Sequence, residues 1–295
     1  MTDMPIDNDV IADIAQSLLP GRPDVIRQMF NAEGARAPEV IWAPTDADLR
    51  NPLLRRFAEI VRGYRTADGH VPARALRLED FGGLTEWLML VDAIDGGKDF
   101  QYTFYGPSIA DHYGRDMTGR RTSEFAGHIA SFFAGLYSAA IQRGEPVYSE
   151  HEPPASVFVR VWQRLIVPLS DGSGRIVRFL VLNVPDNELR TGLELMVDPV
   201  FVLTREQDLL YANRAAQTLF KLRPTRTPGE TLEQATGIVL DTPLCPEEML
   251  SKHRVEDSVQ LTIREAIVER LVMTVSAAQH RGHAFYVVVM RLIGT

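Results

Sequence analysis

The order of hydrophobic and polar positions is clearest in residues 197–220, which read VDPVFVLTREQDLLYANRAAQTLF. An apolar run at 200–203, a polar stretch and a second apolar run at 209–211 together predict a two-stranded hairpin. Asn213 follows directly, and the apolar residues after it recur at three-to-four spacing, as on a helix capped by an asparagine. The stretch therefore predicts strand, turn, strand and capped helix.

The same order occurs earlier in the chain. Apolar runs and two-residue alternation predict strands at 88–94 and 100–105, joined by the turn Asp95-Gly96-Gly97, and a long helix over 123–143 follows them. Further strands are predicted at 147–151, 157–169, 175–184, 259–264, 267–276 and 284–293, with a helix starting near Pro246. Each half of the chain thus predicts two strands, helices and three more strands.

Helices are also predicted outside these halves. Apolar faces indicate helices over 8–19 and 23–31, and a third after Thr45 that Asp46 or Asp48 could cap. The first two either pack on the domain that follows or form a dimer contact. Residues 186–196 predict a helical connector, in which Leu189, Leu193 and Met196 share one stripe. This stripe fits either pairing across a dimer or packing on one of the sheets.

The order in 197–220 resembles the entry of a PAS domain, through the segments DPVFVL, LYAN and AAQTLF. The first half resembles an alphaproteobacterial-type, hence bacterial, PAS variant, through VPARALRLEDF, FQYTFYG and YGRDMTGR. The resemblance implies an α+β fold with two PAS domains, each a five-stranded antiparallel sheet covered by helices, with a pocket between sheet and helices. The expected domains are an N-terminal helical extension (1–44), a first PAS domain (45–185), the connector (186–196) and a second PAS domain (197–295).

Composition limits the function classes. With 45% hydrophobic and 24% charged residues the chain is typical of a soluble globular protein, and it has no apolar run of the roughly 20 residues that cross a bilayer. Its net charge of -8 argues against direct nucleic-acid binding. The start MTDMPIDNDV carries no secretory pattern, and the single Cys245 excludes an internal disulfide. The expected location is the cytoplasm.

Enzymatic motifs are not found in the sequence. It contains no phosphate-binding glycine loop, nucleophile elbow, zinc spacing or two-histidine helix motif, so the chain is expected not to be an enzyme. Asp111-His112 and Glu150-His151-Glu152 are sequence neighbours, which do not face one another on a helix or strand.

An aromatic set in the first domain is the candidate ligand pocket. The predicted ligand-binding residues are Trp87, Tyr102, Phe104, His112, His128, Phe132, Arg160 and Trp162. Strand alternation places Arg160, Trp162 and Arg164 on one face. An arginine that points inward requires an anionic ligand or a carboxylate such as Asp92 or Glu86.

Cofactor chemistry stays open at this stage. The resemblance allows haem to bind through His112 or His128, although both also fit ordinary hydrogen-bonded helix histidines. The light-sensing flavin motif GxNCRF is missing, Cys245 precedes a proline, and no metal site is predicted.

The predicted function is a cytoplasmic sensing and protein-interaction module that forms a homodimer. No kinase core, cyclase or helix-turn-helix occurs in these residues, so we expect either the input half of a longer regulator or action through a partner protein. The alternatives are a haem-based gas or redox sensor and a small-molecule enzyme that uses the first pocket. A small-molecule site is expected in 45–185, and dimer or partner contact in the second domain.

Overall fold

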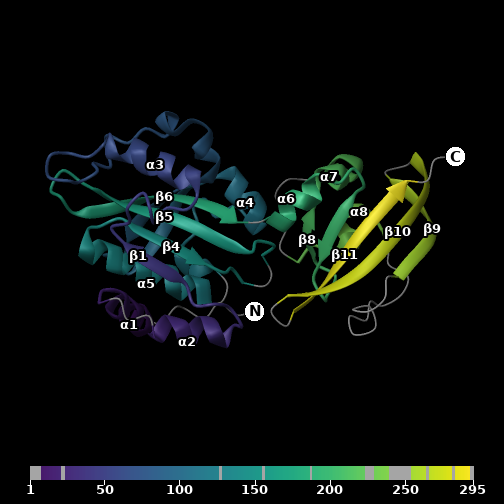
Figure 1. The fold of residues 1–295 in the computed structure, drawn as a ribbon, viewed down its shortest axis with the longest axis horizontal. Coiled ribbons are helices and arrows are strands. Elements are labelled where there is room, and N and C mark those ends of the chain that lie inside the picture. The colour runs from purple at the N-terminus through teal and green to yellow at the C-terminus, as the bar shows by residue number, and fades with distance from the viewer. Residues whose placement is uncertain are drawn as a thin grey trace. The chain divides into compact units, whose positions relative to one another are not determined.

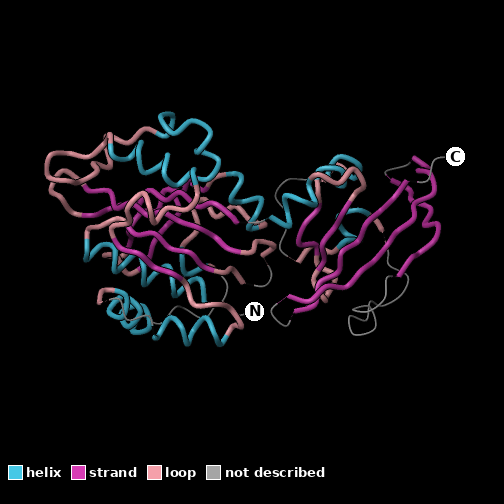
Figure 2. Tube along the Cα trace, in the orientation of Figure 1, coloured by secondary structure: helices cyan, strands magenta, loops and turns pink. Residues whose placement is uncertain are grey.

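The computed structural model describes residues 8–20, 24–125, 128–154, 157–186, 188–222, 229–238, 254–263, 266–280 and 283–292. Contacts divide the chain into two compact units, the first holding most of residues 1–186 and the second most of 187–295. Both units are mixed α/β with antiparallel sheets (Figures 1 and 2). No helix among the described ranges is long and apolar enough to cross a membrane.

The first unit contains a six-stranded sheet in the order β1-β4-β5-β6-β2-β3. Its strands are β1 (Glu39–Trp42), β2 (Leu88–Ile94), β3 (Asp99–Tyr105), β4 (Val147–His151), β5 (Val161–Ser170) and β6 (Ile176–Asp186). The sequence predicts five strands here. The sixth, β1, pairs with β4 at the edge and comes from the segment assigned to the helical extension. Four residues are too few to show a two-residue period.

Helices cover both faces of this sheet (Figure 1). The 3₁₀ segment η1 (Leu78–Trp87) and α3 (Pro52–Arg62) pack on one face, through Leu54 and Phe57 against Leu165 and Val167. The long α5 (His128–Arg143) packs on the other face, where Tyr137 stacks on Phe179 at 5.0 Å. The shorter α4 (Pro107–Tyr113) and η2 (Thr122–Glu124) lie between β3 and α5 in the sequence.

The start of α3 differs from the expectation. The cap is Asn51, whose side chain accepts from Leu53 N at 2.9 Å, and Pro52 occupies the first helical turn. Asp48 accepts instead from Thr45 N and Oγ1, at 2.8 and 2.7 Å. Pro52 has no N–H to satisfy and has a fixed φ, which favours a helix that begins there rather than earlier.

The N-terminal helices α1 (Asn8–Leu18) and α2 (Asp24–Ala32) pack on the outer side of α5. Their apolar residues Ile14, Leu18, Ile26 and Phe30 are all buried within the one chain. Of the two interpretations of this segment, packing on the following domain is therefore what the structure shows. The result is a layer order of α3, sheet, α5 and N-terminal helices.

Gly135 permits the close approach of α1 to α5. An added Cβ at this position would lie 2.3 Å from Ile14 Cγ2. We expect Gly135→Ala to lower the free energy of unfolding by about 1–3 kcal/mol, since overpacking outweighs the gain in helix propensity. Gly192→Ala, where a Cβ would meet no atom within 4 Å, is the matched control and should stabilise instead. Urea titrations of both variants measure this, and equal effects would contradict the packing account.

The second unit contains a five-stranded sheet in the order β8-β7-β11-β10-β9. Its elements are β7 (Val200–Leu203), β8 (Leu209–Ala212), β9 (Arg254–Ile263), β10 (Ala266–His280), β11 (His283–Leu292), α6 (Glu188–Glu194), α7 (Arg214–Phe220) and α8 (Leu232–Thr236). In both units the first strand of the repeated pattern lies beside the last strand, and the second forms an edge. The predicted helix near Pro246 falls outside the described residues.

Candidate functional site

Three polar residues form a row across the sheet face that α5 covers. Arg164 on β5 lies opposite Ser149 on β4 and Asn183 on β6, and residues directly opposite in a sheet share a face. His151 lies two residues beyond Ser149, so its side chain faces the same way. We call these four residues, Ser149, His151, Arg164 and Asn183, the Arg164 cluster. They are at most 4% exposed.

Arg164 is a buried cation with no counter-ion among the described residues. Its Nε donates to Asn183 Oδ1 at 2.6 Å, and its Cζ lies 3.7 Å from the ring centroid of Phe133 on α5. No carboxylate in the described part of the chain pairs with it. The two acids expected as partners are engaged elsewhere: Asp92 accepts from Arg178 Nη2 at 2.8 Å, and Glu86 from Ser108 Oγ at 3.2 Å.

Several polar atoms of the Arg164 cluster have no hydrogen-bond partner among the described residues. They are Arg164 Nη1, Asn183 Nδ2, Ser149 Oγ and His151 Nδ1. Leaving one such buried group unsatisfied costs about 1–3 kcal/mol, and more if it is charged. Because four such atoms lie together in the Arg164 cluster, we take it as the candidate binding site.

His151 contributes donors and acceptors rather than charge. Burial lowers the pKa of its imidazole well below 6.5, and the nearby Arg164 and His128 lower it further. The ring is therefore neutral at pH 7, and it packs 4.9 Å from the ring of Phe133. The described side chains of the Arg164 cluster thus carry one net positive charge.

The burial of His151 predicts that the free energy of unfolding depends on pH. Because the folded pKa lies below the unfolded value, the unfolded state binds more protons between the two, so stability rises with pH through that window. The stability that depends on a neutral His151 is fully present above about pH 6.5, and it is lost as the pH falls toward the folded pKa. Between pH 7.5 and 5.5 the wild type should lose about 1.3 kcal/mol more than His151→Leu.

Urea titrations at the two pH values measure this difference. The matched control His70→Gln removes an exposed histidine, so it should follow the wild type. A His151→Leu variant with the wild-type pH dependence would show that the imidazole titrates normally in the folded chain.

A second polar group lies beside α5. The hydroxyl-bearing residues Tyr102, Tyr137 and Thr122 are fully buried. Burial raises the pKa of the Tyr102 and Tyr137 phenols, so both stay neutral. They add polarity to this layer without adding charge.

The structure separates the eight residues predicted to bind ligand. Tyr102 and Trp162 are buried, and His128 and Phe132 lie on α5, where Phe30 packs against them at 4.3 and 5.2 Å. Phe104 packs against the α3-side core instead.

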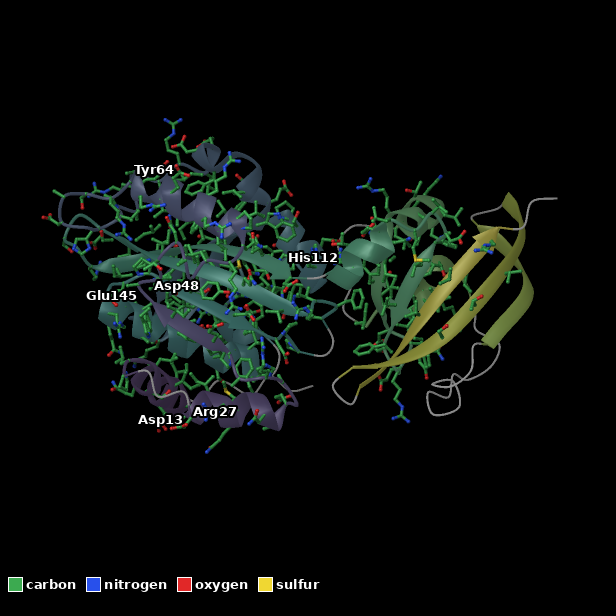
Figure 3. All side chains as sticks on the ribbon, viewed as in Figure 1. Asp13, Arg27, Asp48, Tyr64, His112 and Glu145 are labelled. Carbon is green, nitrogen blue, oxygen red and sulfur yellow. The ribbon has the colours of Figure 1, made fainter. Side chains whose placement is uncertain are left out.

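The remaining three residues, Trp87, His112 and Arg160, do not take part in the Phe30 contact. His112 on α4 (labelled in Figure 3) has its ring 5.1 Å from Trp87 and 6.1 Å from Trp162. Arg160 precedes β5, so strand alternation does not place it, and it forms a surface ion pair with Asp186. The inward arginine of this segment is Arg164.

The haem hypothesis depends on how the two helix histidines are packed. His112 Nδ1 lies 2.8 Å from Ser108 O, and the His128 ring meets Phe30 edge-on at 4.3 Å. The contact of His112 Nδ1 with a backbone carbonyl is one that metal-ligating histidines also make, so it does not decide against haem. At His128 a porphyrin would have to displace Phe30.

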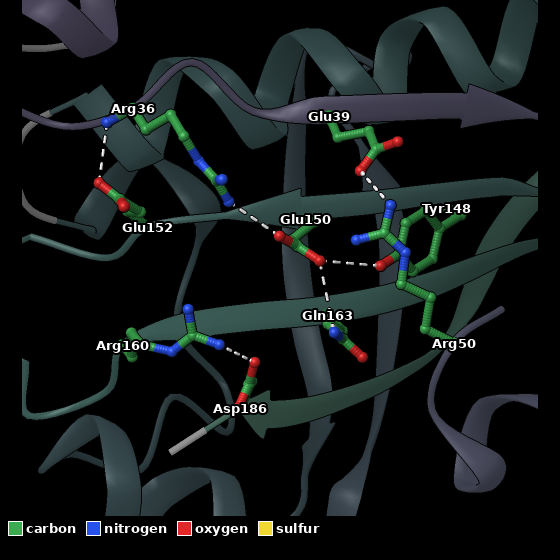
Figure 4. A network of polar contacts seen from close by, with 9 residues as sticks. All are labelled: Arg36, Glu39, Arg50, Tyr148, Glu150, Glu152, Arg160, Gln163 and Asp186. Atoms are coloured by element: carbon green, nitrogen blue, oxygen red, sulfur yellow. Dashed lines mark hydrogen bonds and ion pairs between the residues drawn. The ribbon is translucent and has the colours of Figure 1, made fainter. Parts of the chain in front are cut away.

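A network on the opposite face binds the N-terminal segment to β4 (Figure 4). The nearly buried Glu150 accepts from Arg36 Nη2 at 2.9 Å, Tyr148 Oη at 3.2 Å and Gln163 Nε2 at 3.3 Å. Arg36 N also donates to Glu152 at 2.8 Å. Here the buried carboxylate of Glu150 has a cationic partner, whereas Arg164 has no anionic partner among the described residues, so this network is structural.

A groove of about 500 Å³ lies on the α3 side of the first unit, and Asp46 and Glu145 are among the residues that line it. Leu165 and Val167 form part of its lining. Three of its charged residues are already paired, Arg62 with Asp46 at 3.3 Å and Glu145 with Arg143 at 2.7 Å. The groove has room for a ligand, whereas the Arg164 cluster has polar atoms without hydrogen-bond partners among the described residues.

The sequence indicates Arg164 as an inward cation but assigns no ligand-binding role to Ser149, His151 or Asn183. Their signal is the same alternation applied to β4 and β6, which places three polar residues at inward positions of otherwise apolar strands.

No family model and no curated protein matches the sequence. Among solved structures, the chain is similar to the PAS domain of nitrogen regulation protein NR(II) from Vibrio parahaemolyticus, at 25% identity over 36% of this chain and 99% of that one, with a TM-score of 0.31. The PAS domain of Bordetella pertussis BvgS gives 15% identity, 36% and 85% coverage and a TM-score of 0.31. The periplasmic domain of RsbU from Chlamydia trachomatis gives 13% identity over 96% of this chain and 94% of that one, with a TM-score of 0.30. The functional proposal is therefore argued from the strand order and the side-chain contacts.

Proposed function

We propose that the chain is a signal-sensing module of two PAS-like units, in which the first unit binds a small molecule at the Arg164 cluster. The observation that carries this proposal is a buried guanidinium that has no counter-ion in the part of the chain that the structure describes, beside polar atoms that have no hydrogen-bond partner there. Burying a charge in this way costs several kcal/mol unless something pairs with it. A bound ligand would supply the pairing.

The packing around the cluster suits a sensor. Phe133 on α5 contacts both Arg164 and His151, and α1 and α2 pack on the outside of the same helix. A ligand that pairs with Arg164 must adjust Phe133, and the shift is passed to α5 and its outer helices because packed interfaces move together. Ligand occupancy is thereby converted into a change of surface.

The second unit is assigned to contact with a second copy of the chain. Its described core under α7 is filled by apolar side chains such as Phe201, Phe220 and Tyr286. Just before β7, Leu195 and Val197 are 81% and 90% exposed, and Met196 between them is also exposed. Consecutive exposed apolar side chains in a connector fit a dimer contact.

This assignment predicts that Leu195→Glu/Val197→Glu weakens the dimer about tenfold or more, because the contact would bury two charges. Sedimentation velocity over a concentration series measures the change. Val25→Glu, which alters an equally apolar but separate exposed side chain on α2, is the control and should leave the dimer unchanged. A dimer that survives the double substitution would place the contact elsewhere.

Native mass spectrometry of the full chain tests the sensing role. We expect a small-molecule adduct on the wild type and on Arg160→Met, and its loss from Arg164→Met. The two arginines are four residues apart, but only Arg164 is buried. An adduct retained by Arg164→Met would overturn the proposed site, and a haem absorbance spectrum that depends on His112 or His128 would favour the haem-sensor alternative.

A further inference from the structure

We propose that the ligand of the Arg164 cluster is a small carboxylic acid with an apolar or aromatic body. This inference rests on the proposed function and names the ligand class of that site.

The charge of the cluster selects the charge of the ligand. Arg164 contributes one positive charge, His151 is neutral, and Ser149 and Asn183 are uncharged. The neighbouring helix contributes Phe133 and the histidine His128. A monoanion neutralises this site, whereas a phosphoryl dianion would leave a buried negative charge in excess.

The free donors match a carboxylate. The Nε of Arg164 is used by Asn183 Oδ1, which leaves Nη1 as an unpartnered guanidinium donor among the described residues. The Nδ2 of Asn183 is unpartnered as well, and it belongs to the residue that already bonds Arg164. A carboxylate has two oxygens and accepts hydrogen bonds from more than one such donor.

The surroundings favour an apolar body for the ligand. Phe133 stacks on Arg164, and Phe132 and Phe133 approach the His151 ring at 5.9 and 4.9 Å. Trp162, two residues before Arg164 on β5, shares its face. A ligand whose carboxylate meets Arg164 therefore places the rest of its atoms against aromatic rings.

The test compares acids with their uncharged amides on the full chain. Acetate, benzoate and 3-phenylpropionate are each matched with acetamide, benzamide and 3-phenylpropionamide, and phenyl phosphate represents the dianion. Tryptophan fluorescence reads the thermal midpoint of the first unit, since Trp42, Trp87 and Trp162 all lie in it. We expect saturating benzoate or 3-phenylpropionate to raise the midpoint by about 5 °C. The amides should raise it by less than one fifth of that.

The variants separate this inference from the proposed function. Arg160→Met should keep the acid response and Arg164→Met should lose it. Equal shifts by acid and amide, or no shift by any acid, would overturn the carboxylate class. An acid shift retained in Arg164→Met would show that the acid binds elsewhere than the Arg164 cluster, which contradicts both the inference and the proposed site. If Arg164→Met does not fold, two other measurements test the inference. One is the comparison of acids with amides on the wild type, and the other is Asn183→Leu, which should weaken the acid response. A larger shift with phenyl phosphate, or a native adduct without acid response, contradicts the inference but leaves sensing at this site intact.

Discussion

Replacing Asn213 by leucine is expected to lower the free energy of unfolding of the second unit by about 4 kcal/mol. Asn213 is fully buried and joins three elements. Its Oδ1 accepts from Val200 N on β7 and Ala216 N on α7, both at 2.9 Å. Its Nδ2 donates to the carbonyl oxygens of Asp198 at 2.9 Å and Leu193 at 3.1 Å, and is 3.3 Å from that of Met196. Leucine removes the helix cap and leaves two buried amide groups without an acceptor.

Circular dichroism during urea unfolding measures this loss. Tryptophan fluorescence is the internal reference, because the three tryptophans lie in the first unit and their transition should stay in place. Asn51→Leu is the matched control. Asn51 also caps a helix, but among the described residues its side chain accepts only from Leu53 N, so a loss of about 1 kcal/mol is expected. Equal losses at Asn51 and Asn213 would show that Asn213 is only a cap.

Removing the charge of the Arg164 cluster should raise the free energy of unfolding, in contrast to the loss expected at Asn213. We expect Arg164→Met/Asn183→Leu to raise the free energy of unfolding of the ligand-free first unit by about 2 kcal/mol, and to abolish ligand binding. The wild type buries a guanidinium and an amide with few partners, and two apolar side chains of similar size avoid that desolvation. Stability lost to a functional site is regained when the site is removed.

Urea unfolding followed by tryptophan fluorescence measures this effect too. Arg178→Met is the control, because Arg178 lies on β6, close in the same sheet, but pairs with Asp92. Breaking that partly exposed pair should cost about 1 kcal/mol. A loss of similar size in the Arg164 variant would mean that its bonds to Asn183 and Phe133 already compensate the charge.

Local patterns predicted a large part of the fold. The hairpin at 197–212 and the capping role of Asn213 follow from residue order alone, because a short polar side chain between a strand and an apolar helical period has few other uses. The N-terminal helices also follow from their apolar faces. What the sequence does not show is that Asn213 also holds the connector, since carbonyl partners at 193, 196 and 198 carry no side-chain signal.

The candidate site was predictable only in part. Alternation along β5 identified Arg164, but it also included Arg160, because the point at which the strand begins is set by pairing with β6 rather than by local pattern. Ser149 and Asn183 join Arg164 through strand register, which a single sequence does not specify. The sequence therefore indicates an inward cation, and the structure supplies its neighbours.

The central claim is that the first unit binds its ligand at Arg164, on the α5 side of the sheet. Nuclear magnetic resonance of the ¹⁵N-arginine-labelled chain tests this directly, because the Nε–H of Arg164 is buried and bonded to Asn183, and so exchanges slowly enough to be observed. Arg164→Met assigns the signal. On titration with benzoate, the account predicts that the Arg164 Nε–H resonance shifts while the backbone amide resonances of Arg62 and Arg65, in the α3-side groove, stay in place. Shifts at the groove arginines with an unmoved Arg164 would contradict it.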